Sequence, residues 1–175
     1  MGVILKANSV KLIIGLIGKE EIFNRVKKIL IQKFGAIDFE SPVLDFNFTD
    51  YYELEMGGNL KRQFLSFKRQ ILPDKLASIK IYTNSLEKRF SASGGRRRVN
   101  IDPGYLTLSK LVLATTKDYQ HRIYLGKGIF AEVTLRFKDK SFREWEWTYP
   151  DYRSREYIDI FNYIRNNLCE KKERK

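Results

Sequence analysis

The order of hydrophobic patterns along the chain constrains its fold more than any other feature. Residues 10–17 (VKLIIGLI) are apolar on both faces, which is typical of a strand at the centre of a sheet. The apolar residues of 22–34 recur at helical spacing until Gly35, where a helix is expected to end. Residues 37–49 alternate between apolar and polar side chains, as in a half-buried strand. The first part of the chain is therefore predicted to be strand, helix, strand.

The same kinds of pattern continue to residue 106. Residues 64–71 predict a third strand, and Pro73 suits the first turn of a helix with one apolar side. Residues 99–106 predict a further strand, which we expect the Pro103-Gly104 pair to interrupt with a turn. The resulting order is the βαββαβ pattern of ferredoxin-like folds, in which two helices cover one face of an antiparallel sheet. We therefore predict an α+β fold with a ferredoxin-like core.

The rest of the chain is expected to add antiparallel strands and a final helix to this core. Residues 108–115 fit either a strand or a helix, whereas 121–137 predict a hairpin turned by Gly126-Lys127-Gly128. Residues 141–149 alternate and would place Trp145, Trp147 and Tyr149 together before Pro150 opens the last helix. No linker divides the sequence, so we expect residues 1–175 to form a single domain, with 170–175 as a frayed basic tail.

The charge of the chain is strongly positive and unevenly distributed. The formal net charge is +12, and residues 88–175 contain 20 of the 33 Lys and Arg but 11 of the 21 Asp and Glu. Such an excess favours anionic partners, a small phosphorylated molecule or RNA, although a solvated Lys-rich surface explains it equally well. No apolar run is long enough to span a bilayer and no cleavage site follows the start, so we expect a cytoplasmic protein without a membrane partner.

Cysteine and histidine are too rare for most metal cofactors. With only Cys169 and His121, an internal disulfide and a Cys-rich or multi-histidine zinc site are excluded, and we expect no zinc, haem or iron–sulfur cofactor. Mg²⁺ held by carboxylates remains an option. The sequence also lacks the GxxxxGK[ST], GxGxxG, HExxH and GxSxG signatures, which argues against an ordinary P-loop NTPase.

Two stretches combine cations with acid/base groups. In the first, Arg96-Arg97-Arg98 precede Asp102, whose expected turn could hold phosphate or metal, although an Asx-turn before Pro103 is the simpler explanation. In the second, Thr116, Lys117, His121 and Arg122 could bind phosphate oxygens and transfer a proton, although a lone histidine is more often structural. Both stretches are therefore candidates for an anion-binding site.

Three other groups have alternative explanations. Glu132 is expected to face away from the apolar side of its strand, either as a site carboxylate or as a solvated cross-strand partner. Asp50 and Glu55 could hold Mg²⁺ or could form an acidic turn that balances Lys61 and Arg62. The aromatic residues between Trp145 and Tyr152 could stack on bases, but sheet packing is more common.

Six stretches of the chain resemble an uncharacterised prokaryotic family, the domain-of-unknown-function family 4416. They are FTDYYELEMG (48–57), RQFLSFKR (62–69), IKIYTNSLE (79–87), VNIDPGYL (99–106), LVLATTKDYQHRIYLGKGIFAEVTL (111–135) and WTYPDYR (147–153). The resemblance covers nearly the whole chain. It implies a set of recognisable polar residues: Thr49, Asp50, Tyr51, Tyr52, Glu55, Arg62, Asn84, Asp102, Tyr105, Lys110, Thr116, Lys117, His121, Arg122, Glu132, Trp147, Tyr149 and Arg153.

These features favour a protein that binds a nucleotide or another phosphorylated small molecule in a basic cleft. Phosphoryl or nucleotidyl transfer or hydrolysis would be the reaction class, with Asp102, His121 and Glu132 as catalytic groups and Asp50 and Glu55 as metal ligands. The predicted ligand-binding residues are Arg97, Tyr105, Lys110, Thr116, Lys117, Arg122 and Arg153. The alternative functions are an RNA-binding module that uses the basic and aromatic face, and an interaction protein whose charges are merely solvated.

Overall fold

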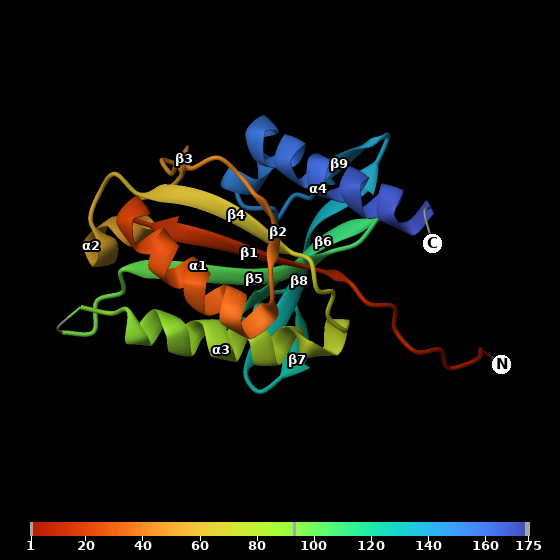
Figure 1. Cartoon of the computed structure of the whole chain (residues 1–175), viewed down its shortest axis with the longest axis horizontal. Helices are drawn as coiled ribbons and strands as arrows, with labels where there is room; N and C mark the ends of the chain where they lie inside the picture. The colour runs from red at the N-terminus through yellow and green to blue at the C-terminus, as the bar shows by residue number, and fades with distance from the viewer. Residues whose placement is uncertain (1, 93, 174–175) are drawn as a thin grey trace.

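The computed structural model describes residues 2–92 and 94–173 and contains a nine-stranded sheet with all its pairings antiparallel. The strands follow the order β2-β4-β1-β5-β6-β8-β7, with β3 paired to β4 and β9 paired to β8 (Figure 1). The elements are β1 (Lys11–Gly18), α1 (Glu20–Phe34), β2 (Ile37–Glu40), β3 (Leu44–Asp45), η1 (Asp50–Tyr52), α2 (Glu53–Met56), β4 (Lys61–Phe67), η2 (Pro73–Lys75), α3 (Leu76–Arg89), β5 (Val99–Leu106), β6 (Lys110–Thr115), β7 (Ile123–Gly126), β8 (Ile129–Lys138), β9 (Ser141–Glu144), η3 (Asp151–Arg153) and α4 (Arg155–Glu173). The α+β prediction is confirmed.

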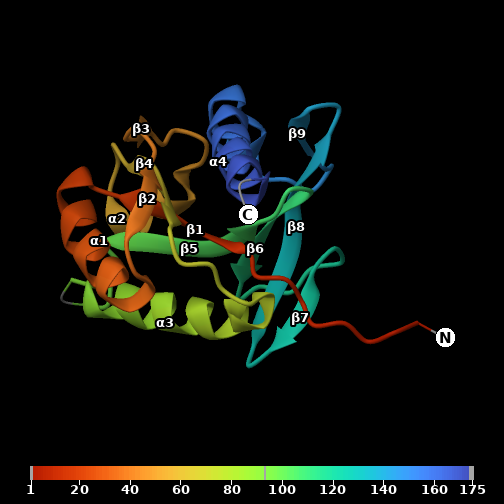
Figure 2. The same ribbon diagram turned by 45° about the vertical axis from the view of Figure 1, so that its right-hand side comes forward.

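The first half of the sheet agrees with the predicted βαββαβ order. Strands β2, β4, β1 and β5 lie side by side, and α1 and α3 cover the same face of them (Figures 1 and 2). Leu12, Ile14 and Leu16 of β1 pack under these helices. Ile13, on the other face of β1, belongs to a second core beneath α4. This explains why β1 is apolar on both faces.

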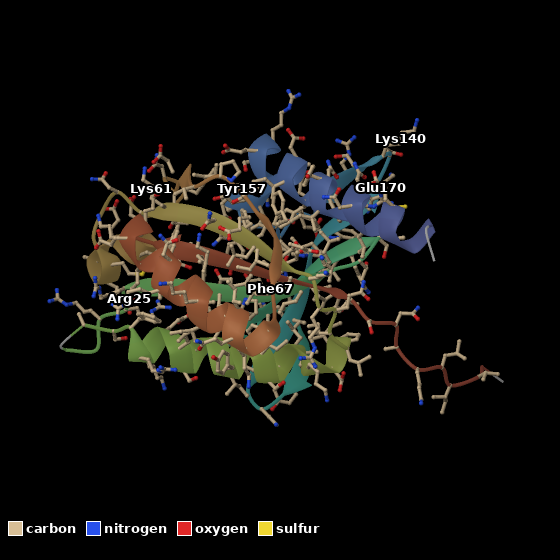
Figure 3. The ribbon with its side chains drawn as sticks, viewed as in Figure 1. Arg25, Lys61, Phe67, Lys140, Tyr157 and Glu170 are labelled. Carbon is tan, nitrogen blue, oxygen red and sulfur yellow. The ribbon has the colours of Figure 1, made fainter. Side chains whose placement is uncertain are left out.

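The second half of the sheet bends away from the first. In Figure 2, β8 runs steeply across the direction of β1 and β5, while α4 lies on the opposite side of the sheet from α1 and α3. Tyr157 of α4 lies between helix and sheet, with its ring centroid 4.7 Å from that of Phe64 (Figure 3). This second core places α4, together with the preceding turn η3, against β4.

Several predicted boundaries differ from the structure. The expected strand 37–49 is divided into β2 and β3, because the chain leaves the sheet around Pro42, which has no N–H for a ladder hydrogen bond. The ambiguous segment 108–115 contains a strand, β6, over Lys110–Thr115, and the alternation of 141–149 yields only the short β9. Helix α4 includes residues 170–173 of the expected tail, whereas 174 and 175 lie outside the described residues. Within the described ranges, no helix has both the length and the apolar character needed to cross a membrane.

The predicted turn at Pro103-Gly104 is wrong. Both residues lie inside β5, where Pro103 pairs with Ile14 and Gly104 with Ile13. On its other side, Gly104 faces β6 so closely that an added Cβ would lie 2.4 Å from the carbonyl oxygen of Val112. Glycine is therefore required here for the close approach of two strands, not for a turn.

Candidate functional site

A fork between β5 and β6 forms the candidate site. Strand β5 pairs with β1 along its whole length, but its pairing with β6 covers only residues 104–106. The outward backbone groups of Ile101 bond instead to α3: its N–H donates to Glu87 Oε1 at 2.7 Å, and its carbonyl oxygen accepts from Lys80 Nζ at 3.2 Å. Pro103, two residues along and facing the same edge, has no N–H to satisfy. The backbone hydrogen-bonding groups of Ile101 at this edge of β5 are thus paired without a neighbouring strand, so β5 and β6 stay apart here.

The fork opens into a cleft of about 620 Å³. Three groups of residues line it. Its apolar wall includes Phe46, Phe48, Tyr51, Tyr52, Leu113, Tyr149 and Tyr152. Its polar floor includes the charged residues Arg62, Lys80, Glu87, Asp102 and Asp151 and the amide Asn100. The exposed residues near its mouth include Lys88, Thr116 and Lys117.

Arg62 is the central cation of the floor. Its side chain is 1% exposed, and its Nη2 donates to the hydroxyl of Tyr152 at 2.6 Å. Carboxylate oxygens of Asp102 and Asp151 lie 3.5 and 3.7 Å from the guanidinium nitrogens. The guanidinium also lies over the ring of Phe64, 4.6 Å from its centroid. Arg62 is therefore held through its two terminal nitrogens and its planar face, whereas its buried Nε has no hydrogen-bond partner among the described residues.

Asp102 is the carboxylate of the floor that faces the cleft most openly. Burial alone would raise its pKa, but the nearby Lys80 and Arg62 and a hydrogen bond from Asn100 outweigh burial and lower it. The Asn100 Nδ2 donates to Asp102 Oδ2 at 2.6 Å. Burial raises the pKa of Asp151, with Arg62 opposing this shift. The two carboxylates that flank Arg62 are thus shifted in opposite directions.

Arg97 connects the floor to helix α2. Its Nε donates to Glu55 Oε1 at 2.8 Å and its Nη2 to Oε2 at 2.7 Å, and its Nη1 donates to the amide oxygen of Asn100 at 3.0 Å. The hydrogen bonds from the Arg97 side chain lower the pKa of Glu55 more than burial raises it. These two predicted site residues therefore neutralise each other, because both carboxylate oxygens of Glu55 accept hydrogen bonds from Arg97. The role of Glu55 as a Mg²⁺ ligand stays a prediction.

The Glu55–Arg97 pair predicts a specific pH dependence. Because the pKa of folded Glu55 lies below its ordinary value of 4.5, the pair stabilises the fold fully above about pH 4.5. This stabilisation is lost as the pH falls through the folded-state pKa, since the unfolded chain takes up the proton first. Glu55→Gln should therefore lower the free energy of unfolding at pH 7 and have a smaller effect near pH 3.

Urea unfolding of both proteins at pH 7, 5, 4 and 3 measures this difference. Glu156→Gln, at an exposed position at the start of α4, is the matched control and should show no such convergence. A Glu55→Gln effect that stays constant down to pH 3 would show that the pair does not stabilise the fold through its charge.

Glu132 organises the loop that carries Lys117. It is 3% exposed, so it is not the solvated cross-strand partner offered as an alternative. Its Oε2 accepts from Arg122 Nε at 2.8 Å and lies 3.3 Å from His121 Nε2. Arg122 in turn donates to the Lys117 carbonyl oxygen at 3.0 Å and to the Tyr149 hydroxyl at 2.8 Å. Arg122 thereby joins the 117–122 loop to the segment that follows β9.

An aromatic stack lies behind this loop. The rings of Trp145 and Trp147 stack with centroids 5.0 Å apart, and His121 also stacks on Trp147, with centroids 5.1 Å apart. The guanidinium of Arg136 lies 4.0 Å from the centroid of Trp145. The Trp147 Nε1 donates to the carbonyl oxygen of Val133 at 3.1 Å. The two tryptophans are together, as expected, but through packing around a turn rather than strand alternation.

The structure brings together only part of the predicted site. The predicted residues that line the cleft are Arg97, Asp102, Thr116, Lys117 and Glu132. His121 and Arg122 lie beside it through their contacts with Glu132.

Four predicted residues lie elsewhere. Lys110 pairs with Arg136 across the opposite end of β6, and Tyr105 packs against a separate apolar cluster. Arg153 donates to the Thr148 and Glu146 carbonyl oxygens, where it holds the turn before η3. Asp50 begins η1 at an exposed position and is not among the residues that line the cleft.

Several residues of the floor were not predicted. Lys80 and Glu87 had a recognisable signal, because they lie seven residues apart on the same side of α3 as Leu76, Ile79 and Leu86. Charged residues on the apolar face of a helix must find buried partners. Asp151 had no comparable local signal, and Arg62 was indicated only as one of the polar residues implied by the family resemblance. In the described part of the chain, no group of three or more His, Cys, Asp or Glu is arranged to hold a metal ion.

Comparison with known proteins identifies a family but no activity. A family model described as a domain of unknown function (DUF4416) matches residues 8–168. No curated protein and no solved structure matches the chain. The functional argument therefore rests on the geometry of the cleft.

Proposed function

The chain belongs to the family described as domain of unknown function DUF4416, and we propose that it binds a nucleotide or a similar phosphorylated small molecule in the β5–β6 cleft. The observation that carries this proposal is that one cleft combines an aromatic wall with two exposed lysines. Its volume of about 620 Å³ is in the range of small-molecule sites. A cytoplasmic location, expected from the sequence, fits such a ligand and stays a prediction.

The aromatic wall suits a planar ligand group. Phe46, Phe48, Tyr51 and Tyr52 form successive ring contacts, with centroids 5.0–6.1 Å apart. Phe48 and Tyr51 remain 41% and 60% exposed, so their rings are accessible to a base. Planar groups stack on such rings or meet their edges favourably. This wall supports a nucleotide over a simple sugar phosphate.

The mouth of the cleft offers uncompensated positive charge. In contrast to Arg62, Lys80 and Arg97, neither Lys88 nor Lys117 has a carboxylate partner within salt-bridge distance in the part of the chain that the structure describes. The Lys117 Nζ donates to the Tyr51 hydroxyl at 3.2 Å and lies 4.5 Å from the centroid of its ring. A phosphate at the mouth would give this lysine a stronger partner than a neutral phenol.

Phosphoryl or nucleotidyl chemistry in the cleft stays a prediction. Asp102 and Asp151 contact the same guanidinium while their pKa values are shifted in opposite directions, an arrangement that suits proton transfer with a ligand group at the floor rather than with the phosphate itself. The predicted proton donor, His121, is not among the residues that line the cleft. Mg²⁺ binding by carboxylates, for which Asp50 and Glu55 are the residues expected from the sequence, also stays a prediction.

The RNA-binding alternative has less support. Trp147 stacks with both Trp145 and His121, and Arg136 lies over the ring of Trp145. The predicted stacking platform is therefore occupied by the protein's own side chains. A solvated surface without a ligand, the remaining alternative, does not explain the aromatic wall.

Lys117→Ala should weaken the binding of nucleoside phosphates about tenfold or more, since it removes a charged hydrogen-bond donor at the mouth. Isothermal titration calorimetry with adenosine and guanosine phosphates, with and without Mg²⁺, measures the affinity. Lys110→Ala is the matched control, because this lysine begins β6 at the end opposite to the loop that carries Lys117 and pairs with Arg136 outside the cleft.

The control should change the affinity less than twofold. Equal losses in both variants would indicate nonspecific attraction to a basic surface, and binding only to long RNA would favour the RNA-binding module. If no nucleotide or sugar phosphate binds the wild-type protein, the proposed function is wrong.

A further inference from the structure

We infer that the ligand binds with its phosphate at the lysines of the mouth and with a hydrogen-bond donor, a hydroxyl or amino group, on Asp102 at the floor. This inference rests on the proposed function and adds the orientation and the recognised group. It follows from the opposite polarity of the two ends of the cleft and from the unused acceptor capacity of Asp102.

The floor and the mouth differ in their charges. On the floor, the cations Arg62, Lys80 and Arg97 are matched by carboxylates within 4 Å. The side chains of Arg62 and Lys80 are 1% and 8% exposed, so a ligand has little access to them. At the mouth, Lys88 and Lys117 are exposed. A phosphate therefore finds accessible cations at the mouth and compensated, covered cations at the floor.

Asp102 has acceptor capacity that the protein does not use. Its Oδ2 accepts a short hydrogen bond from Asn100 at 2.6 Å and lies 3.5 Å from Arg62 Nη1. For Oδ1, the contact described is with Lys80 Nζ at 3.5 Å, the outer limit of a hydrogen bond. An ionised carboxylate can accept about four hydrogen bonds. Because the Asp102 side chain is 25% exposed and lines the cleft, this capacity is available to a ligand.

The chemistry of a carboxylate limits what can bind there. Asp102 accepts hydrogen bonds but cannot donate them while it is ionised, so a phosphate oxygen or a carbonyl oxygen would be repelled. A ribose hydroxyl or an amino group of a base would be accepted. Charge-assisted hydrogen bonds of this kind are roughly twice as strong as neutral ones. Asp102 is therefore expected to decide specificity, whereas the mouth supplies general affinity for phosphate.

Calorimetry on the full-length wild-type protein distinguishes the two sources of the donor. One arm compares adenosine and guanosine 5′-monophosphates with their 2′-deoxy and 3′-deoxy forms, and the other compares guanosine with inosine and adenosine with purine riboside 5′-monophosphates. Loss of the recognised donor should weaken binding about tenfold or more. A loss in the first arm assigns the donor to the sugar, and a loss in the second assigns it to the base.

Asp102→Asn tests whether the selectivity depends on this carboxylate. The affinities of the variant for a ligand and for the analogue that lacks the donor should differ by no more than about threefold. This ratio of affinities is insensitive to a general loss of stability. Retention of the full wild-type selectivity in a folded Asp102→Asn protein would overturn the inference.

The remaining outcomes separate the inference from the proposed function. If nucleotides bind but every analogue binds equally well, the inference is wrong while the proposed function stands. If no nucleotide or sugar phosphate binds the wild-type protein, the proposed function and the inference fail together. Should Asp102→Asn not fold, the wild-type comparison of analogues still decides, because it requires no substitution.

Discussion

Replacing Arg62 with alanine is expected to lower the stability of the protein by about 3–5 kcal/mol, the range found when one partner of a buried charge pair is removed. The substitution leaves Asp102 and Asp151 without their shared cation and the Tyr152 hydroxyl without its donor. It also removes the side chain that packs on Phe64. For a chain of this length, the melting temperature should fall by roughly 6–20 °C.

Two further variants show whether the stability lost in Arg62→Ala depends on the charge of the side chain or on its planar shape. Arg62→Lys keeps the positive charge but loses the planar fork, so its stability should lie between those of wild type and Arg62→Ala. Arg155→Ala is the surface control, because this side chain is 95% exposed and its ion pair with Asp159 is 3.8 Å long. It should change stability by less than about 0.5 kcal/mol. Urea and thermal unfolding provide the measurements, and equal losses for Arg62→Ala and Arg155→Ala would contradict this account of the floor.

Gly104→Ala should destabilise the protein by about 2–3 kcal/mol through overpacking. The added Cβ would lie 2.4 Å from the Val112 carbonyl oxygen and 2.7 Å from a methyl group of Leu113. A backbone oxygen cannot rotate away, so β5 and β6 must separate at the point where their pairing begins. Because β6 leads to Thr116 and Lys117, the affinity for a nucleotide should fall as well.

Gly58→Ala is the matched control for this substitution. The nearest atom to an added Cβ there is Glu53 Oε1 at 3.8 Å, an ordinary contact distance. The control should be neutral or slightly stabilising, since alanine restricts the unfolded chain more than glycine does. Urea unfolding and calorimetric titration measure both effects. A Gly104→Ala protein as stable as wild type would mean that the two strands can separate at no cost.

The floor of the cleft shows how buried charges and a binding site are related in this chain. Networks of buried charges are weak evidence for stability, because desolvation offsets much of their attraction. Lys80 and Glu87 nevertheless have a clear structural consequence, since they satisfy the edge of β5 where a strand would otherwise pair. We expect the same side chains that keep the fork open to set the electrostatics around Asp102.

The periodicity of the sequence determined the elements and much of their arrangement. The two apolar faces of residues 10–17 require cover on both sides, and the structure places α1 and α3 on one face and α4 on the other. The hairpin around Gly126-Lys127-Gly128 followed from turn residues between two apolar runs. The polar residues Asp102, Lys117 and Glu132 were also recognised from the sequence as site candidates, and all three line one cleft. Periodicity, turn residues and clusters of polar residues are local features, so a few neighbouring residues of the sequence are enough to identify them.

Only the tertiary structure decided how charges and strand edges are matched across long separations. Pro103-Gly104 has the local signature of a turn, yet the ladder with β1 and the close approach of β6 keep both residues in a strand. Arg62 meets Asp102 and Asp151, respectively 40 and 89 positions further along the chain. Arg97 is neutralised by Glu55, which lies 42 positions before it in the chain. The physical reason is that a side chain's charge and its access to solvent depend on neighbours brought together by folding, which local sequence patterns do not specify.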